Sequence, residues 1–150
     1  MKVRNASRKS EIKESLDIAR SLKAWFTKEA IKSMSIDFNI NKLFIAVDNY
    51  NVAGFLCYSS KHGTVKILWM GVKKEYWRKG IGSLLIRKLV IEVKKLGVKV
   101  IRVETLTDQD TYEPYKITRD FYKKNGFIKI YTKKAIKKGW DDQDVMEKKI

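Results

Sequence analysis

The sequence predicts an α/β fold, in which a mixed, twisted sheet of about six or seven strands is covered by about four helices. Two observations predict it. Residues 65–72 form a nearly unbroken apolar run, typical of a strand buried on both faces, and residues 83–96 carry apolar residues at helical spacing. A further strand at 98–106 then completes a strand–helix–strand unit, whose two strands we expect to be parallel neighbours.

The elements predicted before this unit are a strand at 2–6, helices at 10–22 and 27–38, and a β-hairpin of strands 43–47 and 52–58. Ser10 can cap the first helix. Glu11 and Glu14 fall in the first turn of this helix, where negative charge suits the helix dipole. In the hairpin the spacing of the apolar residues changes from the helical pattern to the pattern of a strand, and the turn residues 48–51 separate the two strands.

The elements predicted after the unit are a helix at 114–124 and strands at 127–132 and 144–150. Pro114 suits the first turn of a helix, and Asn125 with Gly126 marks its end. Gly97 ends the preceding helix in the same way. Because 150 residues with 44% hydrophobic content suit one compact core, and no linker sequence interrupts them, we expect a single domain over 1–150.

The composition excludes several classes of protein. A single cysteine, Cys57, permits no intramolecular disulfide and argues against a zinc site, so no metal is expected. The amino terminus has no apolar segment of a secretory signal, and no apolar run approaches the roughly 20 residues of a membrane span. We therefore expect a soluble, cytoplasmic protein without a membrane partner.

The charge is unusual, since 33 Lys and Arg against 17 Asp and Glu give a formal net charge of +16. Such a field attracts polyanions, whether nucleic acid, a membrane surface or a phosphorylated cofactor, but it does not choose among them. A solvated lysine-rich surface accounts for the charge equally well.

A glycine-containing loop lies between the buried strand and the long helix. Its sequence at 73–83 is Lys-Lys-Glu-Tyr-Trp-Arg-Lys-Gly-Ile-Gly-Ser. Glycines let backbone N–H groups come close to a ligand, and a helix amino end adds partial positive charge, so together they bind phosphate. The loop matches neither a P-loop nor a dinucleotide fingerprint. A plain tight turn is the alternative interpretation.

The helix predicted at 114–124 carries a second pattern. Helical spacing places Tyr115, Thr118 and Tyr122 on one stripe, beside the end of the preceding strand. A tyrosine in that place could protonate a departing thiolate. The alternative is that Phe121 and Tyr122 only pack the helix on the sheet.

The two patterns, in this order and at this separation, resemble the GNAT superfamily of acetyl-CoA-dependent N-acetyltransferases over nearly the full length of the chain. Residues 76–82 resemble the family's pyrophosphate motif, Gln/Arg-x-x-Gly-x-Gly/Ala, with Trp77 in place of Gln or Arg. Residues 121–127, Phe-Tyr-Lys-Lys-Asn-Gly-Phe, resemble its FY-x-x-x-GF signature. Tyr115 stands where the family often has an asparagine.

The resemblance implies a GNAT-like fold in which the parallel strands 65–72 and 98–106 splay apart. The wedge between them would hold the pantetheine arm of acetyl-CoA, the implied cosubstrate, against backbone groups of Met70 and Val72. The implied cofactor-binding residues are Met70, Gly71, Val72, Trp77, Arg78, Lys79, Gly80, Ile81, Gly82, Ser83, Tyr115 and Lys124.

The resemblance also implies direct attack by a primary amine, of a small molecule or a protein, on the acetyl group. Tyr122 would supply a proton to the leaving thiolate, and a backbone N–H near Val72 would polarise the thioester carbonyl. An alkylammonium of pKa about 10 must first lose a proton. Glu104 is the first candidate base, with Asp108 and an ordered water behind it. An ordinary ion pair with lysine is the alternative role for Glu104.

Two other functions stay open at this point. A noncatalytic CoA sensor would keep the fold and lose the base. A nucleic-acid-binding module would use the lysine-rich surface, but the sequence has neither an RNP motif nor a cysteine–histidine finger, so nucleic acid is disfavoured as a partner. A homodimer also remains possible.

Overall fold

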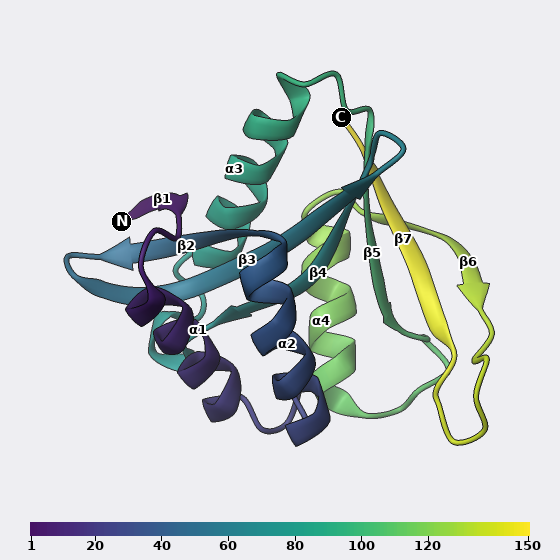
Figure 1. Ribbon diagram of the computed structural model, residues 1–150. Helices are drawn as coiled ribbons and strands as arrows, with labels where there is room; N and C mark the ends of the chain where they lie inside the picture. Colours follow the sequence, from purple (N-terminus) through teal and green to yellow (C-terminus); the bar gives the residue numbers. More distant parts are fainter.

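The computed structural model describes residues 1–150 as a seven-stranded sheet with helices on both faces (Figure 1). The strands are β1 (Lys2–Asn5), β2 (Lys42–Asp48), β3 (Asn51–Lys61), β4 (Thr64–Val72), β5 (Val100–Leu106), β6 (Ile128–Lys133) and β7 (Gln143–Lys149). The helices are α1 (Lys9–Ser21), α2 (Lys28–Ile40), α3 (Ile81–Lys94) and α4 (Glu113–Lys124), with a 3-10 turn at Lys74–Tyr76. The predicted order of strands and helices is confirmed along the whole chain.

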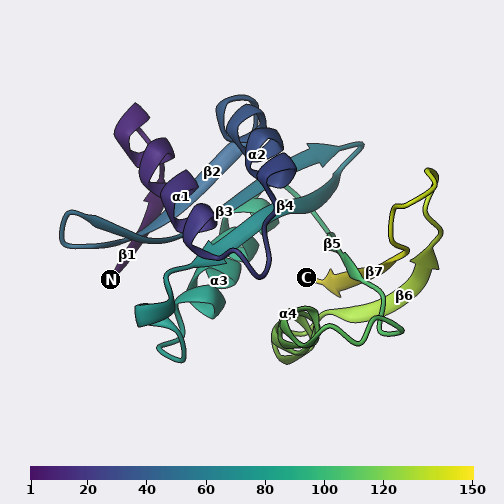
Figure 2. The ribbon, with the colours of Figure 1, turned by 90° about the horizontal axis from the view of Figure 1, so that it is seen from below.

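The helices form two layers, one on each face of the sheet. Seen from below, α1 and α2 lie on one side of the strands and α3 and α4 on the other (Figure 2). Each layer closes its own hydrophobic core: Leu16, Met34 and Phe55 belong to the first, and Leu85 and Ile101 to the second. The burial of these side chains fixes which face each helix presents to the sheet. No helix is long and apolar enough to cross a membrane.

The sheet runs in the spatial order β1-β2-β3-β4-β5-β7-β6, and only β4 and β5 are parallel neighbours. They pair over a short stretch, from Val65 with Ile101 to Ile67 with Val103. Beyond it β4 stays with β3 as far as Val72, and β5 stays with β7 as far as Leu106. The two strands therefore diverge toward their carboxyl ends. We call the gap between Leu68–Val72 and Glu104–Leu106 the wedge; it confirms the predicted splayed pair.

Burial along β4 corrects one expectation. The strand was predicted to be buried on both faces, yet only alternate residues at its start are fully buried, and Leu68, Trp69 and Met70 are half-buried. The physical reason is the wedge, because the strand loses its β5 neighbour where these residues begin. An apolar run in a sequence cannot distinguish a paired strand from one that borders an opening.

Two helix starts also differ from the prediction. The N-cap position of α1 is Arg8, and the capping role expected of Ser10 falls to the carboxylate of Glu11, which accepts the backbone N–H groups of Ser7 and Arg8 at 2.8 and 3.2 Å. The third helix begins at Ile81, two residues earlier than predicted, so Gly82 lies inside its first turn.

Candidate active site

The loop before α3 presents a run of free backbone amides. Among the hydrogen bonds of turns and caps, Trp77 N–H donates to Lys74 O and Leu84 N–H to Gly80 O, and none of the six amides between them donates to the backbone. The first amides of a helix have no partner within it, so α3 leaves these groups pointing outward. We call residues 78–83 the amide cradle. Its geometry and the helix dipole suit an anion such as a diphosphate.

Two left-handed residues shape the cradle. Gly80, the N-cap of α3, has φ 77°, and Arg78 has φ 62°. Glycine adopts this region at no cost, whereas a residue with a Cβ is strained there. The strain at Arg78 was not anticipated from the sequence; backbone strain of this kind clusters at ligand-binding sites, although Asn49 and His62 adopt the same region in the hairpin turns.

Gly82 lets α4 pack directly against the cradle. A Cβ at this position would lie 2.8 and 2.9 Å from two ring carbons of Phe121 and 3.4 Å from the terminal methyl of Met70. The first turn of α3, the ring of Phe121 and the side chain of Met70 therefore meet at one point beside the wedge.

The carboxyl end of β4 turns backbone groups into the wedge. Lys73 N–H donates to Ala53 O on β3 at 2.9 Å, so by strand alternation the backbone groups of Met70 and Val72 face away from β3. The indole Nε1–H of Trp77 donates to the Val72 carbonyl at 2.7 Å. The cradle and this strand end are thus joined by the side chain of Trp77.

Tyr122 lies at the base of the same region. Its ring packs between Phe121 and Phe127, with centroid separations of 5.3 Å on both sides. Its hydroxyl has a single polar contact, with the sulfur of Met70 at 3.9 Å, which is a weak acceptor. Burial raises the pKa of Tyr122 far above its usual value. The phenol therefore stays protonated and holds its O–H without a strong protein acceptor.

Comparison with known proteins identifies this arrangement. The family model described as an acetyltransferase (GNAT) domain matches residues 39–129, which span β2 to β6. The chain belongs to the GNAT acetyltransferase family. Comparison with curated protein sequences finds no significant match.

Solved GNAT structures share the fold at low sequence identity. A Desulfovibrio desulfuricans protein assigned to the GNAT family matches with a TM-score of 0.87 and 21% identity, over 99% of this chain and 98% of that chain. The ribosomal-protein-S18-alanine N-acetyltransferase of Escherichia coli gives 0.78 and 17%, over 99% and 93%. PaiA N-acetyltransferase from Thermoplasma acidophilum, solved with coenzyme A, gives 0.72 and 21%, over 100% of both chains. These similarities show the fold.

Within the GNAT fold, Glu104 is held by two lysines. It lies on β5 at the wedge, with ion pairs to Lys66 on β4 at 3.1 Å and to Lys133 on β6 at 3.2 Å. Burial alone would raise the pKa of Glu104, but the two ion pairs outweigh burial and the pKa is lowered. Asp108, the second candidate base, is paired with Lys129 at 3.3 Å. Both carboxylates are therefore engaged with lysines.

Two predicted cofactor residues lie on α4. Lys124 is exposed at its end, and its side chain makes no ion pair or hydrogen bond within the protein. Tyr115 lies at the other end of α4, where its ring meets that of Tyr112 at 4.6 Å. The structure brings the remaining predicted residues together along the end of β4, the loop and the first turn of α3.

One structural residue of the GNAT site was not singled out from the sequence. Arg119 is buried, and its guanidinium donates to the carbonyls of Leu106, Thr107 and Asp110 at 3.1 to 3.3 Å. It thereby holds the loop that carries the chain from β5 to α4. An arginine within an apolar helical stripe is the signal that could have indicated this role, because a buried guanidinium must have several acceptors.

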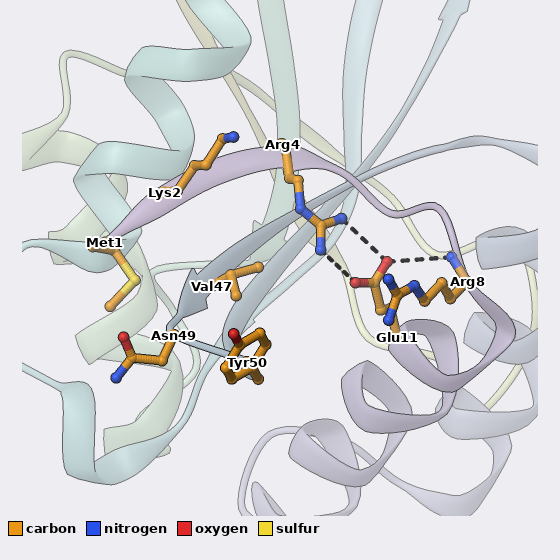
Figure 3. Close-up of a pocket in the computed structure, with 8 residues that line it drawn as sticks. All are labelled: Met1, Lys2, Arg4, Arg8, Glu11, Val47, Asn49 and Tyr50. Carbon is orange, nitrogen blue, oxygen red and sulfur yellow. Dashed lines mark hydrogen bonds and ion pairs between the residues drawn. The ribbon is translucent and has the colours of Figure 1, made fainter.

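A hollow of about 440 Å³, drawn in Figure 3, lies beside β1 and β2. In the strand order it is at the edge of the sheet away from the wedge. It is lined by Met1, Lys2, Arg4, Arg8, Glu11, Val47, Asn49 and Tyr50. Its carboxylate, Glu11, faces the guanidinium of Arg4, with one contact at 3.2 Å, and also caps α1 (Figure 3). The hollow is therefore built around a structural ion pair.

The Arg4 contact should make Glu11 important for stability. The hydrogen bond from Arg4 is the main reason that the pKa of Glu11 is lowered from 4.5 to about 2. Because the folded-state pKa is depressed, this stabilisation is present above pH 4.5 and is lost as the pH falls toward 2. We expect Glu11→Gln to lower the unfolding free energy at pH 7 by about 2–3 kcal/mol. Denaturant titration measures this difference in unfolding free energy.

The pH dependence of the unfolding free energy distinguishes the effect of the Arg4–Glu11 ion pair from the effect of an exposed surface charge. The difference in unfolding free energy between wild type and Glu11→Gln should shrink as the pH falls below 4.5. Asp17→Asn, which removes an exposed carboxylate of α1, should change stability by less than about 0.5 kcal/mol. A pH-independent loss in Glu11→Gln would contradict the assignment.

Proposed function

We propose that the protein is an acetyl-CoA-dependent N-acetyltransferase that acts on a primary amine through a ternary complex. The observation that carries the proposal is the amide cradle, whose free N–H groups lie beside the wedge, where β4 is no longer paired with β5. The residues fit the molecule: the cradle would hold its diphosphate, and the backbone groups of Met70 and Val72 would pair with its pantetheine amides. Acetyl-CoA supplies the acetyl group as a thioester.

Tyr122 is the proposed proton donor to the leaving thiolate. A free thiol is more acidic than a phenol, so proton transfer from tyrosine to thiolate would be unfavourable in water. Burial raises the pKa of both groups: that of Tyr122, and that of a buried thiol such as Cys57 on β3, whose pKa is raised to about 12 by burial and by the charge of Asp37. Burial therefore does not make the phenol the stronger acid. Its O–H would instead donate a hydrogen bond to the sulfur as the C–S bond breaks, stabilise the developing negative charge and so deliver its proton to the leaving group.

Glu104 is the proposed base that accepts the surplus proton of the acceptor amine. Its lowered pKa keeps it ionised, although it also makes the carboxylate a weak base. The proton would pass from the carboxylate to water, with Asp108 behind it. The engagement of both Glu104 oxygens with lysines favours a second candidate function, a noncatalytic acetyl-CoA sensor.

One experiment tests the proposal and separates the two candidates. Isothermal titration calorimetry with acetyl-CoA should show binding in the micromolar range, about −8 kcal/mol, and thiol release should follow when amines are added. Binding without thiol release, across alkyl amines, amino acids and peptides, would identify the sensor. No binding to well-folded protein would overturn both functions.

A further inference from the structure

A row of aromatic rings crosses the opening of the wedge. Trp77 meets Trp25 edge-on at 5.2 Å, and Tyr112 meets Tyr115 at 4.6 Å. Trp25 lies in the connection between α1 and α2, Trp77 in the loop before α3, and the tyrosines at the start of α4. We call these four side chains the aromatic row. Three parts of the chain that are distant in sequence contribute to it.

Hydrogen bonds hold the row in place. Trp25 Nε1–H donates to Pro114 O, and the Tyr112 hydroxyl donates to Ala24 O, both at 3.0 Å. Trp77 is fixed in turn to the carbonyl of Val72, the last residue of β4. Since α4 follows β5 through a short loop, the row bridges from the end of β4 to the chain that leaves β5.

Tyr122 points to a ligand in this region independently of the row. Its side chain is more than nine-tenths buried, and its hydroxyl meets only the sulfur of Met70, which borders the wedge. A buried hydroxyl normally has an oxygen or nitrogen partner. An acetyl thioester and its acceptor in the wedge would supply the missing partner.

The carboxylates beside the row form no ion pair. This holds for Asp110, Glu113 and Asp141, in a chain with 33 Lys and Arg. The Asp110 carboxylate accepts the backbone N–H of Tyr112 at 2.9 Å, and Glu113 follows Tyr112 in the chain. The carbonyl of Asp142 accepts the N–H of Thr107 at 3.3 Å, which brings the adjacent Asp141 to the loop between β5 and α4. Glu104, which lies deeper on β5, is paired with two lysines.

Aromatic faces together with unpaired carboxylates attract organic ammonium groups. We propose that the aromatic row and the carboxylates of Asp110, Glu113 and Asp141 bind the acceptor as a small oligoamine, which carries at least one ammonium group besides the amine that is acetylated. The inference rests on the proposed acetyltransferase function and names its substrate class.

Three acceptors of matched length test the inference: 1,5-diaminopentane, 1-aminopentane and 5-aminopentanoate. Each offers a primary amine, and the far end is positive, neutral or negative. We expect kcat/KM, from thiol release, to be about tenfold higher for the diamine than for the monoamine, and lowest for the amino acid. Spermidine and an aminoglycoside, as further arms, distinguish linear from cyclic oligoamines.

Variants of the carboxylates test whether they cause the preference for the diamine. Glu113 and Asp141 are exposed and make no side-chain hydrogen bond, so the double variant Glu113→Gln/Asp141→Asn should fold normally. It should reduce the diamine-to-monoamine ratio severalfold, through KM of the diamine, while acetyl-CoA affinity is unchanged. Asp17→Asn, which removes one charge from the far surface of α1, should leave the ratio unchanged.

The outcomes separate this inference from the function on which it rests. Absent acetyl-CoA binding would overturn the proposed function. If acetyl-CoA binds, equal rates for the three amines, a preference for 5-aminopentanoate, or transfer to none of them would overturn the oligoamine inference alone. A diamine preference that the double variant leaves intact would also overturn it, because the carboxylates would then play no part.

Discussion

Tyr122→Phe should lower kcat by about a hundredfold, while the affinity for acetyl-CoA stays within about twofold of wild type. The substitution removes only the hydroxyl, whose single polar contact is the sulfur of Met70 at 3.9 Å, so little binding energy is lost. It also removes the O–H donor that a leaving thiolate would need. Single-turnover thiol release measures the transfer step, and calorimetry measures the affinity.

Tyr58→Phe is the matched control for this prediction. Tyr58 is a half-buried tyrosine whose pKa is also raised, mainly by burial, but it packs against Phe44 away from the wedge. We expect its variant to turn over at the wild-type rate. Because the raised pKa keeps Tyr122 protonated, its ionisation should cause no alkaline loss of wild-type activity up to about pH 10. Unchanged turnover in Tyr122→Phe would remove the phenol from the mechanism.

Much of the fold follows from local patterns in the sequence. The switch between strand and helix periodicity at residues 65–106 predicts β4, α3 and β5, and a helical crossover between two strands predicts that they are parallel neighbours. The amide cradle was also predictable from a local pattern, because Gly80 and the first residues of the helix that forms it are neighbours in the sequence.

The rest of the site depends on contacts that no local pattern encodes. The bond from Trp77 to Val72 and the contact of Trp25 with Trp77 depend on side-chain directions set by the packing of separate elements. The ion pairs that engage Glu104 come from β4 and β6, which lie far apart in the sequence. Sequence patterns predict which strand or loop carries each of these side chains, but the order of the strands in the sheet determines which residues they contact.

Gly82→Val is expected to lower acetyl-CoA affinity by about 10- to 100-fold. A side chain placed there meets the ring of Phe121 at 2.8 Å, so either the ring or the first turn of α3 must move. Overpacking of this kind costs about 1–3 kcal/mol, and a shift of the turn would displace the amides that are proposed to hold the diphosphate. Calorimetry with acetyl-CoA and thermal unfolding of the same variant separate affinity from stability.

Gly63→Ala provides the comparison. Gly63 has φ 79° in the turn between β3 and β4, at the end of β4 opposite the cradle, and a Cβ there would meet nothing within 4 Å. This variant should lose about 1 kcal/mol of stability through backbone strain and bind acetyl-CoA as wild type does. In the Gly82→Val background, Phe121→Ala should restore part of the affinity for acetyl-CoA, because it removes the ring with which the valine side chain clashes. Wild-type affinity in Gly82→Val itself would contradict the prediction and would show that the ring of Phe121 moves while the amides of the first turn of α3 stay in place.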